Sequence, residues 1–151
     1  MIDHKRRRFI KGSLAAVGAG LIVPSALADW NADAFHAKEV STAMTGLFGS
    51  DAAEVSDRIR IKAPDIAENG ASVRVMVETD LDGVTSINLI ASKNQHPLVA
   101  SFEFVDPSLI PFIETNIKMA ETADVIAVVK AGDKLYKNAK TVTVTLGGCG
   151  S

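Results

Sequence analysis

The fold is decided by a stretch that reads VRVMVETDLDGVTSINL, residues 73–89. Valine recurs at every second position at Val73, Val75 and Val77, and apolar residues recur in the same way at Ile87 and Leu89. Alternation with a period of two is typical of a strand with one buried face. Leu81-Asp82-Gly83 supplies turn residues between the two runs. The stretch therefore predicts two strands separated by a turn.

The same period continues along most of the chain and predicts about seven strands. The other runs are centred on Ile59/Ile61, Phe102/Phe104, Ile113/Ile117/Met119, Val125–Val129 and Val142/Val144/Leu146. Turn residues separate them at 68–70, 94–97, 106–107 and 131–133. Seven short strands in about 90 residues favour an all-β, immunoglobulin-like β-sandwich. A small barrel is the alternative.

One amphipathic helix is expected ahead of the strands. From Asn31 to about Leu47 the apolar residues Phe35, Val40, Ala43, Met44 and Leu47 recur at steps of three and four. Asn31 or Asp33 can cap its start, and Gly46 and Gly49 stand at its end. The helix is expected to pack outside the sandwich or to lead to a partner.

The first 28 residues are typical of an export signal. Arg6-Arg7-Arg8-Phe9-Ile10-Lys11 fits the twin-arginine pattern, and a short apolar run follows it. This run is too short for the roughly 20 residues of a spanning helix. Cleavage after Ala28 would leave a chain that begins at Asp29, in the bacterial periplasm. An uncleaved N-terminal anchor is the alternative.

The chain is therefore divided into a signal peptide (1–28), one domain (29–146) and a short C-terminal arm (147–151). The formal net charge of the 151 residues is −2, and the leader carries +4, so the mature chain carries −6. Because nucleic-acid binding requires a basic surface, this class is excluded.

No cofactor or metal site is expected. His4 lies in the leader, and His36 and His96 are 60 positions apart without Cys or carboxylate at ligand spacing. Each has an ordinary interpretation, on a helix surface and in a turn. Tyr136 and Trp30 are expected to pack, and the loop carboxylates offer no acid/base pair. The chain is therefore predicted not to be an enzyme.

The chain ends in Gly147-Gly148-Cys149-Gly150-Ser151, which contains its only cysteine. Glycine removes most restriction on φ and ψ, so Gly147, Gly148 and Gly150 are expected to make a movable arm. From Leu146 to Cys149 the arm reaches roughly 10 Å when extended. Such a thiol suits a covalent carrier better than a catalyst, because a catalytic thiol needs a fixed base and oxyanion site.

Other interpretations of Cys149 stay open. An odd cysteine in an exported protein often forms an intermolecular disulfide, so the chain could be an immunoglobulin-like binding or assembly module tethered in this way. A buried structural cysteine and an incidental cysteine in a tail are further alternatives.

One further segment stands out, Ile61-Lys62-Ala63-Pro64-Asp65-Ile66-Ala67-Glu68-Asn69-Gly70. Together with the twin-arginine leader, the N-terminal helix and the terminal Gly-Gly-Cys-Gly, it resembles the SoxY family, the sulfur-carrier subunits of the periplasmic SoxYZ complex. Ser151 stands where the family pattern has glycine, and Asn94-Gln95-His96-Pro97 stands where Asn-Pro-x-Pro is expected.

The resemblance implies an immunoglobulin-like fold and a heterodimer with a SoxZ-like subunit. It also implies that Cys149 bears intermediates of thiosulfate oxidation, first an S-thiosulfonate and then a persulfide. The enzymes that would handle them are a haem-containing thiosulfate-coupling enzyme, a sulfate-releasing hydrolase and a sulfane dehydrogenase.

Overall fold

The structure is a computed structural model that describes residues 31–145. The chain divides into two units, Met1–Trp30 and Asn31–Ser151, and the described residues all belong to the second. They form the helices α1 (Ala32–His36) and α2 (Val40–Phe48) and nine strands. The strands are β1 (Glu54–Val55), β2 (Ile59–Lys62), β3 (Ile66–Ala67), β4 (Val73–Thr79), β5 (Val84–Ala91), β6 (Leu98–Glu103), β7 (Phe112–Ile117), β8 (Ala123–Ala131) and β9 (Lys134–Val144).

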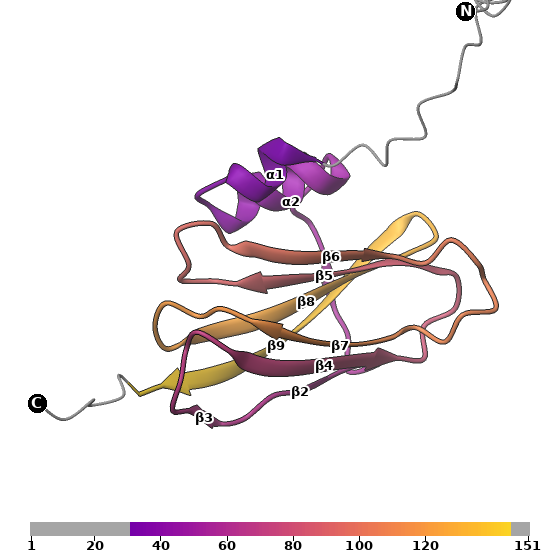
Figure 1. Ribbon diagram of the computed structural model, residues 1–151. Helices are drawn as coiled ribbons and strands as arrows, with labels where there is room; N and C mark the ends of the chain where they lie inside the picture. Colours follow the sequence, from indigo (N-terminus) through magenta and orange to yellow (C-terminus); the bar gives the residue numbers. More distant parts are fainter. Residues whose placement is uncertain (1–30, 146–151) are drawn as a thin grey trace, which may run out of the picture. The chain divides into compact units, whose positions relative to one another are not determined.

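The strands form two sheets that pack face to face as a sandwich (Figure 1). The larger sheet has the order β1-β9-β8-β5-β6, with β3 also paired to β9, and the smaller sheet has the order β2-β4-β7. Most neighbours are antiparallel, and the two short strands β1 and β3 run parallel to β9. The predicted immunoglobulin-like sandwich is confirmed.

The seven predicted strands correspond to β2 and to β4–β9. Two further strands, β1 and β3, were not predicted, because a strand of two residues is too short to show a period. β9 begins at Lys134, well before the run Val142/Val144/Leu146 by which it was predicted, and contains Tyr136. Tyr136 is half-buried and packs against the core, as expected.

The prediction of one helix over residues 31–47 is wrong, because the chain turns at Ala37–Glu39 and forms two helices. The turn lets α1 lie against α2, where a Cβ on Gly46 would approach the Ala34 side chain to 3.2 Å. Asn31 caps α1 through its side-chain oxygen and also donates to the Gly46 carbonyl at 2.6 Å. Contacts between the two halves thus outweigh the continuous helical pattern.

The main hydrophobic core lies between the two sheets and is made mostly by the Val and Ile residues that alternate along β4, β5 and β8. A second cluster forms where α1 and α2 cover the larger sheet, with Ala43 and Met44 packed over Ile90, Leu98 and Val128. The helices therefore cover only part of the outer face of this sheet (Figure 1).

Candidate functional site

The predicted site residues Cys149, Gly147, Gly148 and Gly150 lie outside the described residues, as do Ala28 and Asp29 at the expected cleavage point. What the structure describes is the point from which the C-terminal residues continue, at Val144 and Thr145. We call this point the arm root, meaning residues 143–145 and the side chains and backbone around them.

The arm root is held by a segment far away in the sequence. Residues 63–67 run beside the end of β9, and β3 pairs in parallel with Thr143 and Val144. The Thr143 N–H donates to the Asp65 carbonyl at 2.9 Å, and the Thr145 N–H donates to the Ala67 carbonyl at 3.0 Å. These bonds extend the order of the sheet to the last described residue.

Lys140, which lies earlier in β9, also anchors the 63–67 segment. Its ammonium donates to the Ala63 carbonyl at 2.7 Å and pairs with the Asp65 carboxylate at 3.0 Å. On the opposite side, the Val144 N–H donates to the Thr122 hydroxyl at 3.0 Å. The arm root is thus bonded from both sides, by the 63–67 segment and by the turn before β8.

Gly70 is required by the packing at this end of the sandwich. A Cβ at Gly70 would lie 2.4 Å from the Met119 carbonyl oxygen and 2.9 Å from Val144 Cγ1. The Met119 N–H donates to the Gly70 carbonyl at 2.7 Å, so the two backbones are locked together. Any other residue at position 70 would displace backbone. The absence of a side chain at Gly70 therefore lets the segment 61–70 pack directly against the arm root.

A hollow of about 470 Å³ lies beside Gly70 and is lined by two further loops. Its lining includes Asn94, His96, Lys118 and Met119. The Asn94 side chain donates to the Lys118 carbonyl at 2.7 Å and accepts from the Ala120 N–H at 2.9 Å, so it fixes one loop against the other. The hollow is open and mostly apolar, and through Gly70, whose Cβ position lies beside Val144, it is next to the arm root.

His36 and His96, which sequence reasoning treated as unrelated, lie with their ring centroids 5.9 Å apart in a T-shaped arrangement. His96 Nδ1 lies 3.2 Å from the His36 carbonyl and 3.4 Å from the Ala37 carbonyl, so it is the protonated nitrogen. No sequence signal brings these residues together, since α1 folds onto the 94–97 loop only in three dimensions. Within residues 31–145 no cluster of three or more His, Cys, Asp or Glu is placed to hold a metal ion.

The carboxylates in and directly after β4 are surface groups. Asp80 and Glu78 form a ladder of exposed ion pairs with Arg58, Arg60 and Lys62 across β2 and β4. The hydrogen bond from Arg60, followed by that from Lys62, lowers the pKa of Glu78, and the hydrogen bond from Arg58 lowers the pKa of Asp80. The hydrogen bonds of Arg60 to Glu78 and then to Asp80 raise the pKa of Arg60. None of these groups contacts the arm root.

The arm root offers backbone bonds and shape. Its described polar groups are amides, the hydroxyls of Thr122, Thr143 and Thr145, and the ion pair of the half-buried Lys140 with Asp65. Among the described residues no helix has the length and apolar character needed to cross a membrane. The geometry fits a rigid base from which a terminal segment is presented.

Comparison with known proteins identifies relatives that match most of the domain. The family model described as "Sulfur oxidation protein SoxY" matches residues 44–149. Among solved structures, the sulfur carrier protein SoxY from Chlorobium limicola f thiosulfatophilum is similar with 43% identity and a TM-score of 0.63. The match covers 69% of this chain and 94% of that chain. A search of curated proteins found no match.

A second solved structure shares only the fold. The superoxide reductase (neelaredoxin) from Ignicoccus hospitalis has 14% identity and a TM-score of 0.54, with 62% of this chain and 95% of that chain covered. At this identity the likeness shows a common sandwich architecture and nothing of the chemistry.

Proposed function

Because the chain belongs to the SoxY family of sulfur oxidation proteins, we propose that it carries sulfur on Cys149 at the end of a short arm. The family places it among the sulfur-carrier proteins of the Sox system. The observation that most directly supports Cys149 as the attachment point is the extent of the family match, which runs to residue 149 and ends on the only cysteine of the chain.

The structure of the arm root supports this role. A carrier arm needs a fixed origin, so that a receiving enzyme meets the thiol at a predictable distance from the protein surface. The bonds of Thr143 and Thr145 to the 63–67 segment provide such an origin. Beyond it, Gly147, Gly148 and Gly150 leave the cysteine with small neighbours that would fit a narrow enzyme channel.

The proposed chemistry uses thiosulfate as the sulfur source. In the first step the Cys149 sulfur bonds to the outer sulfur of thiosulfate, which releases the thiol proton and two electrons to the haem enzyme that couples them. In the second step water attacks the terminal sulfonate group, so that sulfate leaves and a persulfide stays on Cys149. The partner enzymes supply both the oxidant and the hydrolytic base, and the carrier supplies the attachment atom.

The working form is a heterodimer with a SoxZ-like subunit in the periplasm, after export by the twin-arginine route. A sulfane dehydrogenase would oxidise the sulfur that remains on the arm. The protein itself is a covalent carrier and not an enzyme.

The test is intact mass spectrometry of the mature protein isolated from thiosulfate-grown cells, with and without reductant. We expect S-thiosulfonate and persulfide adducts on Cys149 that reductant removes and that the Cys149→Ser variant lacks. A bare thiol, or only a disulfide-linked dimer, would refute the carrier role, and the dimer would favour the binding module tethered through Cys149.

A further inference from the structure

Exposed apolar side chains gather in the loop between β6 and β7. Of the six large apolar side chains that are exposed in residues 31–145, four lie within this loop or at its end. They are Val105 (88% exposed), Leu109 (50%), Ile110 (82%) and Phe112 (45%). We call these four residues the loop patch. Apolar side chains that cluster in this way on a surface usually mark an interaction site.

Hydrogen bonds within the loop hold its backbone in one conformation, and this conformation keeps the apolar side chains on the surface. The Asp106 carboxylate accepts from the Ser108 N–H at 2.8 Å and from the Ser108 hydroxyl at 2.7 Å. The Leu109 N–H donates to the Asp106 carbonyl at 3.1 Å, and Pro107 and Pro111 stiffen the backbone between these bonds.

Both ends of the loop are also anchored to the sandwich. The Phe104 N–H donates to the Thr85 carbonyl at 2.9 Å, and the Thr79 N–H donates to the Pro111 carbonyl at 3.2 Å. A loop ordered before binding loses little conformational entropy when it binds, which favours a specific partner.

A hollow of about 330 Å³ continues the loop patch onto the outer face of the larger sheet. Val105 and Phe104 form one wall of this hollow, and Leu47 and Phe48 at the end of α2 form another. The buried Asn88 also lines the hollow, where its amide accepts from the Ser101 hydroxyl at 2.6 Å. A partner therefore meets a projecting apolar loop with a recess beside it, the arrangement in which interface anchors are usually seated.

The charge around the loop patch is acidic. Glu103 and Asp106 border it, and neither forms an ion pair with a cation within the described part of the chain. Lys130 also lines the hollow and is the one cation among its described lining residues. Because the mature chain carries −6, a complementary partner would place Lys or Arg side chains opposite Glu103 and Asp106.

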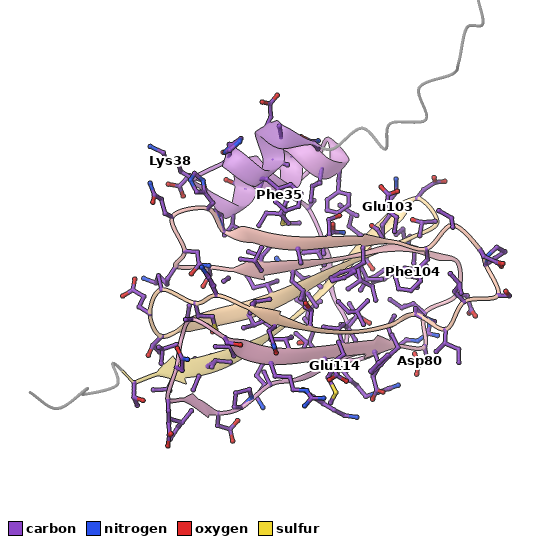
Figure 2. All side chains as sticks on the ribbon, in the orientation of Figure 1. Phe35, Lys38, Asp80, Glu103, Phe104 and Glu114 are labelled. Carbon is purple, nitrogen blue, oxygen red and sulfur yellow. The ribbon has the colours of Figure 1, made fainter. Side chains whose placement is uncertain are left out.

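The loop patch lies at the end of the sandwich away from the arm root. Figure 2 shows Glu103, Phe104 and Asp80 together at this end, and Figure 1 shows β9 running to the other. The loop patch adjoins Thr85 and the end of the sandwich where β9 begins at Lys134. The 11 residues of β9 span about 33 Å at roughly 3.3 Å per residue, so a protein on the loop patch leaves the arm root uncovered.

We propose that the loop patch binds the second subunit of the carrier, through a surface of that subunit with an apolar centre and a basic rim. This inference rests on the proposed function. The distance between the loop patch and the carrier arm favours a permanently bound subunit, and not an enzyme, as the partner at the loop patch. An enzyme that acts on Cys149 must approach the opposite end, whereas a subunit that stays bound during turnover must not cover it.

The test measures binding of the mature chain to the purified SoxZ-like subunit by isothermal titration calorimetry. Val105→Asp and Ile110→Asp are each expected to weaken binding about 30-fold or more, the loss typical of a buried apolar anchor. Val55→Asp is the matched control, because Val55 is 74% exposed on β1 and lies outside the loop patch. Its affinity is expected to stay within about threefold of wild type. The charge reversals Glu103→Lys and Asp106→Lys are expected to slow association, most strongly at low salt.

Each outcome decides the matter. Unchanged affinity of the two loop-patch variants, with wild type bound, would overturn this surface while leaving the carrier role of Cys149 intact, since mass spectrometry tests that role separately. No binding of wild type would overturn both the surface and the proposed subunit. Sedimentation showing a wild-type homodimer that Ile110→Asp dissociates would assign the loop patch to a second copy of this chain. Because all substituted side chains are exposed, thermal unfolding within about 1 °C of wild type is the check on folding.

Discussion

Replacing Gly70 by alanine tests whether the arm root is as tightly locked as its contacts indicate. A Cβ at this position would lie 2.4 Å from the Met119 carbonyl oxygen, and an ordinary contact begins near 3.4 Å, so the two backbones must separate by about 1 Å. The close atom is a backbone oxygen, which cannot rotate away. The same movement would stretch the 2.7 Å bond from the Met119 N–H to the Gly70 carbonyl.

The magnitude follows from three contributions to the free energy of unfolding. Overpacking costs about 1–3 kcal/mol, and loss of the hydrogen bond costs about 1 kcal/mol. Replacing glycine lowers the entropy of the unfolded chain and returns about 0.4–1 kcal/mol. We therefore expect Gly70→Ala to destabilise the domain by about 2 kcal/mol, which lowers the midpoint of urea unfolding by about 1 M.

The assay is urea unfolding followed by fluorescence or circular dichroism, together with amide hydrogen exchange at Thr143 and Thr145. Exchange at these amides should be faster in Gly70→Ala, because they bond to the segment that the new methyl group displaces. Gly49→Asn is the control: Gly49 has φ +74 with no atom within 4 Å of its Cβ position, and Asn tolerates this conformation. A Gly70→Ala protein within about 0.5 kcal/mol of wild type would refute the steric argument.

Three further outcomes are expected. Lys140→Met should cost about 1 kcal/mol of unfolding free energy, because it removes the bond to the arm-root segment and the pairing with Asp65; urea unfolding at low and high salt measures it. Asn94→Ala should lower the free energy of unfolding by about 1–2 kcal/mol, because two hydrogen bonds are lost. Asn94→Asp keeps only the acceptor, so its midpoint of thermal unfolding should lie between those of wild type and Asn94→Ala. The lowered pKa values of Glu78 and Asp80 mean that their contribution to the free energy of unfolding is complete above about pH 5 and is lost as pH falls through the folded-state pKa values. Urea unfolding of a Glu78→Gln/Asp80→Asn double variant should therefore depend less on pH below about 5 than wild type does; an equal slope would contradict this.

The regular strands could be read from the sequence because their signal is local. A strand such as β4 places Val73, Val75 and Val77 on one face, and the alternation needs no knowledge of what lies opposite. The turn residues Asp82-Gly83 and Gly132 are equally local, because φ values of +69 and +58 at the two glycines favour a residue without Cβ. The break between α1 and α2 could not be read in this way, since residues 31–47 keep a helical pattern that only their packing interrupts.

At the candidate site, the segment 61–70 shows the difference between what the sequence indicates and what only the structure shows. Sequence comparison marked it only as a motif that accompanies the terminal cysteine, with no indication of where it lies. In the structure its residues Asp65 and Ala67 bond to Thr143 and Thr145, across nearly 80 positions of sequence. A motif and an arm that are far apart in the chain thus form one physical unit.

By itself the sequence determined the β-rich domain, the turns and the placement of Cys149 among glycines, because each depends on neighbours within a few residues. Tertiary structure alone decided that Gly70 must be glycine, that β3 runs parallel to β9, and that the apolar loop stands at the end remote from the arm root. These features arise from contacts between segments distant in the chain, and such contacts leave no period in the sequence from which they could be inferred.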